Sequence, residues 1–222
     1  MADTPLVRRA GRRLILAAAV AVLVVGIVLA VFGYQQRRPP TAATAAPKVV
    51  STTTPSPAPP AAPAVEGPLL SRSEPATVDI AEIGLHAPVT AVGLDTEGSV
   101  QVPPPDQSRR AGWYDQGPTP GELGPAVLVG HLDSTSGPAV FYDVGTVRAG
   151  STVEIRRADR STAVFTVDTV ERFSKADFPT QRVYGDLNRA ELRLITCGGD
   201  YDPEQGGYQD NTVLFAHLTG SR

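Results

Sequence analysis

The sequence has 222 residues, which is enough for one domain of ordinary size with residues left over. Its one cysteine excludes an internal disulfide and any metal site built from several thiolates, and the three histidines lack zinc-site spacing, so we expect no metal and no cofactor. The net charge of −3 divides into +5 for residues 1–75 (eight basic, three acidic) and −8 for residues 76–222 (twelve basic, twenty acidic). An acidic folded part with few aromatic residues argues against a nucleic-acid-binding protein.

The N-terminal region carries a long apolar run. No charged or polar side chain interrupts the chain from Leu14 to Gly33, and at ~1.5 Å per residue this run spans a hydrocarbon core of roughly 30 Å. Four arginines precede the run and two follow it, which predicts a cytoplasmic N-terminus. A cleaved signal peptide is the alternative, but its apolar region would be about 7–15 residues long and would end in an Ala-x-Ala-like site. We therefore expect a basic cytoplasmic tail (1–13) and a single-pass transmembrane signal anchor (14–34), with the rest of the chain outside the cell.

Residues 35–75 have the composition of a linker. They are rich in Pro, Ala, Thr and Ser and include ten prolines, so both helix and sheet are disfavoured. Such a segment buries too little apolar surface to offset the entropy of ordering. We expect a disordered, extended stalk that holds the following domain away from the membrane.

Residues 76–222 are expected to form one β-rich domain. Short apolar or alternating runs recur there between Gly, Pro and Asp residues, a pattern typical of an all-β barrel or sandwich. We predict an all-β fold, a single closed barrel of about seven or eight strands, with short helical turns near residues 141–147 and 175–180. The predicted strands are 77–80, 86–91, 126–130, 152–156, 163–171, 192–196 and 212–218.

Two strand ends carry reactive side chains. The apolar run Leu192–Ile195 leads to Cys197, and two glycines follow at once, so we expect this strand to end with the thiol at its tip. The strand 126–130 leads in the same way to His131. A thiol and an imidazole are the pair that nucleophilic thiol chemistry requires. The alternative is a buried structural cysteine and a structural histidine.

These two stretches resemble the active-site strands of sortases. The resemblance extends in order over about residues 76–220, and it is greatest to the class E and F enzymes of high-GC Gram-positive bacteria (Actinobacteria). It implies a sortase-like β-barrel. The motifs that carry it are Leu192-Arg-Leu-Ile-Thr-Cys197, Val129-Gly130-His131, Trp113-Tyr114, Pro120-Gly121-Glu122, Phe141 and Tyr208-Gln-Asp-Asn-Thr-Val-Leu-Phe-Ala216.

The resemblance implies a membrane-anchored cysteine transpeptidase. Such an enzyme cleaves a Leu-Pro-x-Thr-Gly-like sorting signal of a surface protein between Thr and Gly and holds the acyl half as a thioester. An amine of a peptidoglycan precursor or a pilin then accepts it. Carried over to this sequence, Cys197 is the nucleophile, His131 is the acid/base group and Thr196 supports the oxyanion region.

One residue departs from the family pattern. Sortases carry a catalytic arginine on the strand after the cysteine loop, where this chain has Asn211, with Gln209 two residues earlier. Side chains alternate along a strand, so Arg193, Ile195 and Cys197 are expected on one face and Leu192, Leu194 and Thr196 on the other. Arg193 then lies roughly 13 Å along the strand from Cys197 and could reach toward the substrate carbonyl. The alternative is that Asn211 or Gln209 supplies the donor.

The missing arginine also supports a second reading of the whole domain. A catalytically degenerate β-domain, held at the cell surface by the same stalk, would act as a binding or assembly module in which the cysteine is structural.

Overall fold

The computed structural model describes residues 64–222. The predicted tail and anchor and most of the predicted linker lie outside these residues. Among the residues that are described, none belongs to a helix with the length and apolar character that crossing a membrane requires.

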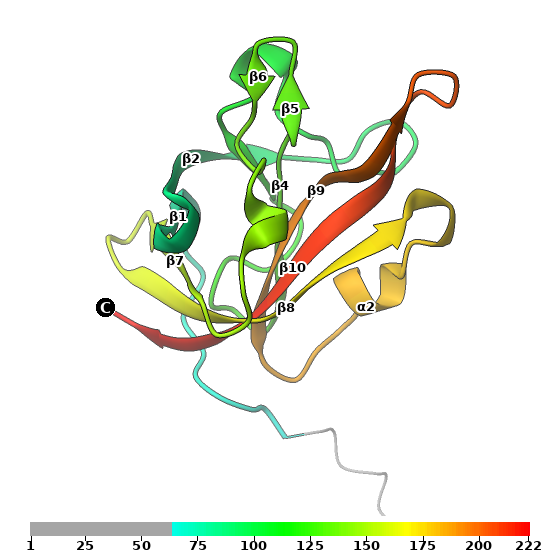
Figure 1. Cartoon of the computed structure of the whole chain (residues 1–222). Coiled ribbons are helices and arrows are strands. Elements are labelled where there is room, and N and C mark those ends of the chain that lie inside the picture. Colours follow the sequence, from blue (N-terminus) through cyan, green and yellow to red (C-terminus); the bar gives the residue numbers. More distant parts are fainter. Residues whose placement is uncertain (1–63) are drawn as a thin grey trace, which may run out of the picture. The chain divides into compact units, whose positions relative to one another are not determined.

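Eight strands close into a barrel in the order β1-β2-β3-β4-β9-β10-β8-β7 (Figure 1). The prediction of an all-β closed barrel is therefore confirmed. A separate two-stranded sheet, β5 (Asp133–Ser134) with β6 (Gly137–Pro138), follows β4. The barrel strands are β1 (Pro75–Ile80), β2 (Leu85–Val92), β3 (Ala111–Tyr114), β4 (Gly124–Val129), β7 (Thr152–Arg157), β8 (Thr162–Ser174), β9 (Ala190–Asp202) and β10 (Gly207–Ser221).

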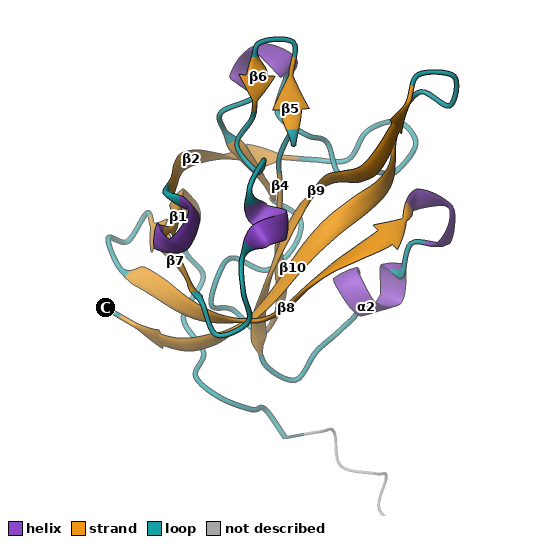
Figure 2. Cartoon of the chain, in the orientation of Figure 1, coloured by secondary structure: helices purple, strands orange, loops and turns teal. Residues whose placement is uncertain are grey.

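The helices are short and lie in the connections between strands (Figure 2). Both predicted helical turns are confirmed, since η3 falls within residues 141–147 and η4 within 175–180. Sequence reasoning missed β3, which has only four residues, one of them Gly112, and shows no alternation because three of the four are buried. The helical elements are η1 (Ala81–Ile83), η2 (Pro105–Gln107), η3 (Val144–Thr146), η4 (Lys175–Asp177) and α2 (Thr180–Tyr184).

The strand that carries Cys197 is longer than predicted. The prediction that it ends at the two glycines is wrong, because β9 continues to Asp202 and pairs with β10 on both sides of them. The pairing shifts between Gly198 and Tyr201, where two residues of β9 face the single residue Gln209 of β10. Gly199 adopts a φ of 74°, and a Cβ there would lie 2.3 Å from the Asp210 carboxylate. The glycines therefore form a β-bulge that bends the strand rather than ending it.

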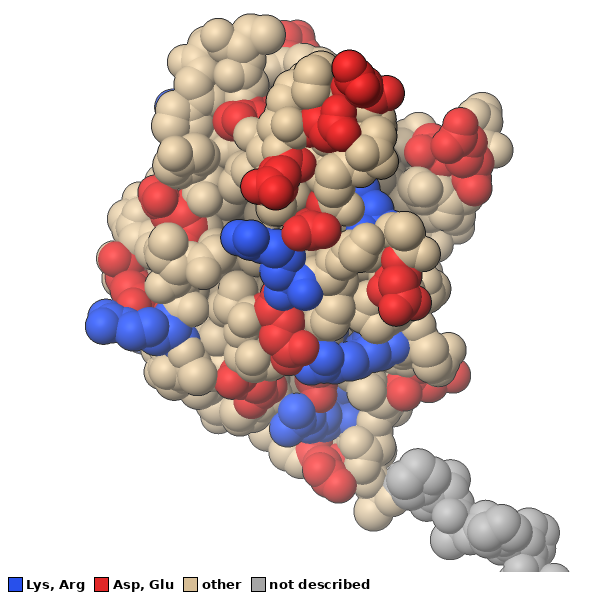
Figure 3. Space-filling model, turned by 45° about the vertical axis from the view of Figure 1, so that its right-hand side comes forward, with Lys and Arg blue, Asp and Glu red and all other residues tan. Residues whose placement is uncertain are grey.

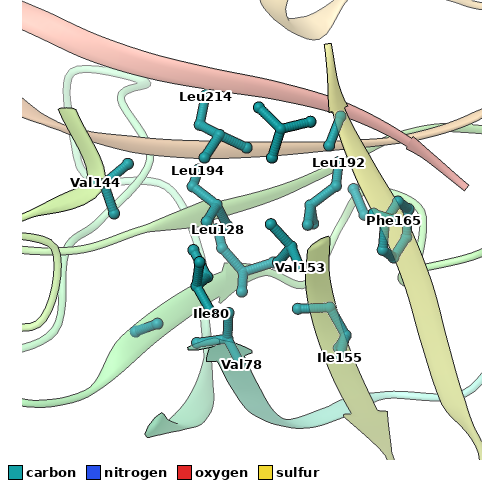
Figure 4. Close-up of a cluster of buried hydrophobic side chains, with 14 of the residues drawn as sticks. Val78, Ile80, Leu128, Val144, Val153, Ile155, Phe165, Leu192, Leu194 and Leu214 are labelled. Carbon is teal, nitrogen blue, oxygen red and sulfur yellow. The ribbon is translucent and has the colours of Figure 1, made fainter. Parts of the chain in front are cut away.

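The apolar side chains form two clusters on opposite faces of the barrel wall. The larger cluster fills the barrel interior and includes Leu192 and Leu194 of β9, both fully buried (Figure 4). The smaller cluster lies on the outer face, where Ile195 joins Val129 and Phe215 under α2. The predicted alternation of faces along β9 is therefore confirmed. Burial of each large apolar side chain contributes about 1.5–3 kcal/mol to the free energy of unfolding.

Residues 64–74, at the end of the predicted linker, lie against the barrel. The Leu70 N–H donates to the Gly121 carbonyl at 2.8 Å, and the Ser73 N–H donates to Thr119 Oγ1 at 3.1 Å. The Leu70 side chain also occupies the space that a Cβ on Gly121 would need. These contacts attach the segment that precedes β1 to the β3–β4 connection.

Candidate active site

Cys197 lies on the outer face of β9 and is half-buried. Its register partner on β10 is Asn211. Directly opposed residues of an antiparallel pair project on the same face with Cβ atoms roughly 5 Å apart, so the Asn211 amide is a neighbour of the thiol. Within residues 64–222, the hydrogen-bond contact to Sγ comes from Lys175 Nζ, at 3.9 Å.

The parallel pairing of β4 with β9 relates the position of His131 to that of Cys197. Val129 pairs with Ile195, and the Gly130 N–H donates to the Ile195 carbonyl at 3.0 Å. His131 and Cys197 each follow this pair by two positions, so they lie at the same end of two neighbouring strands. A Cβ on Gly130 would lie 2.6 Å from the ring of the fully buried Phe141, so glycine at this position lets that ring pack against β4. The register therefore puts the two residues that the sequence singled out at the same end of neighbouring strands.

The hydrogen bond of the His131 ring fixes which nitrogen carries a proton. Nε2 lies 2.7 Å from the carbonyl oxygen of Pro103. A carbonyl only accepts, so Nε2 must donate its hydrogen there, and Nδ1 is the nitrogen of the neutral ring that can accept a proton. Pro103 is the first of three consecutive prolines, residues 103–105, which restrict the backbone there. Its carbonyl therefore orients the half-buried imidazole of His131.

A tyrosine and a carboxylate complete the surroundings of the pair. Tyr208 Oη donates to Asp133 Oδ2 at 2.5 Å, and the ring of Tyr201 packs edge-on against that of Tyr208 at 5.2 Å. This hydrogen bond, together with partial burial and the negative charges of Asp133 and the Cys197 thiolate, raises the pKa of Tyr208 to about 12. Sequence reasoning did not assign Asp133 a role, although it follows His131 by two residues.

Of the two candidate replacements for the family arginine on β10, only Asn211 lies opposite the thiol. Gln209 sits at the bulge, and its Nε2 donates to the Gly207 carbonyl at 2.6 Å. The side-chain amide of Gln209 is therefore hydrogen-bonded within its own strand.

The Thr196 side chain points to the other face of β9. It is 3% exposed, it lies on the face that lines the barrel interior, and its hydroxyl has no hydrogen-bond partner among residues 64–222. The Thr196 hydroxyl is thus separated from the thiol by the strand itself.

Arg193 shares the outer face with Cys197 but points away from it. Its Nη2 lies 2.5 Å from Glu191 Oε2, its Nη1 donates to the Leu192 carbonyl at 3.2 Å, and its guanidinium lies 4.6 Å from the Phe215 ring centre. Glu191 and Leu192 precede Arg193 in β9, whereas Cys197 follows it. Burial lowers the pKa of Arg193, and the Glu191 carboxylate opposes this shift. The structure does not bring Arg193 to the thiol.

One hollow of the described surface lies away from the thiol. It has a volume of about 400 Å³ and is lined by residues that include Tyr114, Val127 and Tyr184, beside the start of β4. Neither Cys197 nor His131 lines it. Acidic and basic side chains alternate over the face drawn in Figure 3, which shows no continuous basic surface.

The buried ion pair of Arg193 generates a stability prediction. We expect Glu191→Gln to lower the free energy of unfolding by about 3 kcal/mol, because it leaves the buried Arg193 guanidinium without its counter-charge. Chemical denaturation of the purified protein measures this loss. The control is Glu154→Gln, which breaks the more exposed pair with Arg222 and should cost at most ~1 kcal/mol. Equal losses in the two variants would contradict a special role for the buried pair.

The Tyr208–Asp133 hydrogen bond generates a prediction about pH. The folded pKa of Tyr208, about 12, exceeds the ordinary value of 10.0, so the contact stabilises the fold fully below about pH 10 and this contribution is lost as the pH rises toward 12. NMR titration of isotope-labelled tyrosines should show one phenol ionising near pH 12. Asp133→Asn should move that phenol toward 10, and an unchanged titration would refute the assignment.

A model of the Sortase domain family matches residues 78–219. Curated protein sequences contain no significant match. Among solved structures, the barrel is similar to sortase A from Corynebacterium diphtheriae, at 20% identity and a TM-score of 0.50 over 68% of this chain and 62% of that one. It is also similar to Streptococcus agalactiae sortase C1 in complex with MTSET, at 18% identity and a TM-score of 0.50 over 65% of this chain and 66% of that one.

Because the sequence identities are low, the similarity to these two structures shows a shared fold alone. The chain covers 62–66% of the length of these two matched structures. The family match is independent of them and spans β1 to β10, including both Cys197 and His131. By this match, the chain belongs to the sortase family.

Proposed function

We propose that this protein is a membrane-anchored cysteine transpeptidase of the class E or F type. It would cleave a Leu-Pro-x-Thr-Gly-like sorting signal between Thr and Gly and transfer the acyl half to an amine of a peptidoglycan precursor or a pilin. Family membership supports the reaction type, and the flanking motifs noted in the sequence support the class.

In the proposed acylation step, Cys197 acts as the nucleophile and His131 as the acid/base group. The thiol proton of Cys197 passes to Nδ1 of His131, and sulfur attacks the carbonyl carbon of the threonine. As the tetrahedral intermediate collapses, the C–N bond breaks, and His131 returns the proton to the departing amine of glycine. The Asn211 amide, opposite the thiol, is the side-chain donor placed to bind the oxyanion.

The transfer step reverses these roles. The acceptor amine attacks the thioester carbon and loses a proton to His131. The C–S bond breaks, sulfur leaves as thiolate, and the proton returns to it from His131. Arg193 takes no part in either step of this proposal, because its guanidinium is held by Glu191.

One observation carries the proposal. In a sortase-family barrel, His131 and the only cysteine of the chain each follow the paired residues Val129 and Ile195 by two positions, and the His131 ring donates to Pro103 from Nε2, which leaves Nδ1 as the proton acceptor. A structural cysteine would require neither an accessible thiol nor an imidazole with a fixed proton position.

Cys197→Ala tests the nucleophile. The full-length protein is incubated with a panel of Leu-Pro-x-Thr-Gly-like peptides and amines, and its intact mass is followed. The unsubstituted protein should gain the mass of the acyl half and release a transfer product, whereas Cys197→Ala should do neither while unfolding normally. His131→Ala should slow turnover by about 10²–10⁴-fold. Turnover by Cys197→Ala would contradict the mechanism. If the unsubstituted protein cleaves none of the peptides, the non-enzymatic binding module is favoured.

The proposal places the barrel outside the cell, and a topology assay tests this. The support is the apolar run over 14–34 with its excess of arginine on the N-terminal side. Protease added to intact cells should remove a tag fused after Arg222, and a tag before Met1 should be cut only after the membrane is permeabilised. The reverse protection pattern would refute the predicted orientation.

A further inference from the structure

We propose that Lys175 supplies the positive charge of the active site, stabilising the Cys197 thiolate and the oxyanion of the tetrahedral intermediate. The first part rests on a contact in the fold alone, since Nζ lies 3.9 Å from Sγ. The second part rests on the proposed function. Sequence reasoning gave Lys175 no role, because 22 residues separate it from Cys197 along the chain.

Three neighbouring strands bring Lys175 to the thiol. Cys197 of β9 pairs with Asn211 of β10, which pairs with Phe173 of β8. These three side chains share the outer face. Lys175 follows Phe173 by two positions, just beyond the end of β8, and its side chain extends to the thiol. Lys175 thus reaches Cys197 across Asn211, the residue that stands where the family has its arginine.

The turn that carries Lys175 is held on both sides. Ser174 caps η4, its hydroxyl accepting from the Ala176 N–H at 3.3 Å. Beyond the turn, the ring of Phe178 packs edge-on against that of Phe173 at 6.2 Å. The backbone around Lys175 is therefore anchored to the outer apolar cluster.

The charge of Lys175 is available to the thiol because no carboxylate among residues 64–222 forms an ion pair with it. The arginines on the same face each form an ion pair with a carboxylate. Arg182 pairs with Glu171, while Arg189 and Arg193 share Glu191. Lys175 is one of only two lysines in the chain, the other being Lys48, among 20 basic residues.

Arg172 is another cation close to this stretch of β9 and provides a matched control. It pairs with Thr212, which pairs with Thr196, so it belongs to the inner face of the wall. Its Nε lies 3.6 Å from the position that a Cβ on Gly198 would take. Arg172 is thus close to the same stretch of β9 as Lys175 but on the opposite side of the strand from the thiol.

The positive charge of Lys175 stabilises negative charge at two points of the acylation step. Negative charge rests first on sulfur and then, once the C–S bond forms, on the carbonyl oxygen. A fixed ammonium near both positions lowers the energy of each without giving up a proton. At about 4 Å in partly screened surroundings, such a charge is worth roughly tenfold or more in rate.

Thiol alkylation tests the contact without any sorting peptide. Rates with iodoacetate and iodoacetamide are measured at neutral pH for the unsubstituted protein, Lys175→Met, Lys175→Arg and Arg172→Met. Lys175→Met should slow alkylation by iodoacetate about tenfold or more and by neutral iodoacetamide less, because the ammonium also attracts the anionic reagent. Lys175→Arg should keep most of both rates, and Arg172→Met should stay near the unsubstituted values. Unchanged rates in Lys175→Met, or an equal loss in Arg172→Met, would overturn the proposal.

Turnover and mass analysis test the second part. For a peptide that the unsubstituted protein cleaves, Lys175→Met should lower kcat about tenfold with little change in KM. Lys175→Arg should keep much of the original kcat. Peptide mapping should find the acyl group on Cys197. An acyl group on Lys175 would overturn the role of a spectator charge, because Nζ would then be acting as an amine nucleophile. If no peptide is cleaved, the proposed function fails, while the alkylation rates still decide whether Lys175 serves the thiol.

Discussion

The active site depends on one constraint, the parallel register of β4 with β9. Val129 and Ile195 are paired, and the Gly130 N–H continues the ladder to the Ile195 carbonyl. A slip of one residue would turn every side chain of β9 to the other face, moving Leu192 and Leu194 out of the barrel interior and the thiol into it. The packing of the core and the position of Cys197 at the same strand ends as His131 are therefore set by the same register.

The strand β9 has two faces with different tasks. Its inner face is apolar up to Thr196, and it closes the barrel core. Its outer face passes from the charge pair of Glu191 and Arg193, through Ile195, to the thiol. Arg193 is stacked on Phe215 and matched by Glu191, which fits a residue that holds the outer face together rather than one that contacts a substrate.

The polar groups around the thiol come from three separate segments. Asp133 begins β5 shortly after His131, Tyr208 is the second residue of β10, and Lys175 follows β8. Asp133 accepts the hydrogen bond of the Tyr208 hydroxyl, and within residues 64–222 the ammonium of Lys175 is the cation in contact with sulfur. The family arginine is absent from its expected strand, and a lysine from the opposite side of Asn211 occupies the space beside the thiol.

The sequence by itself determined the all-β class, the barrel, the alternation of faces along β9 and the choice of Cys197 and His131. These follow from local signals, namely apolar periodicity, turn residues and one cysteine with one strand-end histidine. It did not determine the length of β9, because two glycines end a strand or bulge it depending on what the partner strand offers. Nor could it place Arg193 or Lys175. Whether a charged side chain points to the thiol depends on its ion-pair partners and on strand pairing across distant segments, and only the tertiary structure brings those together.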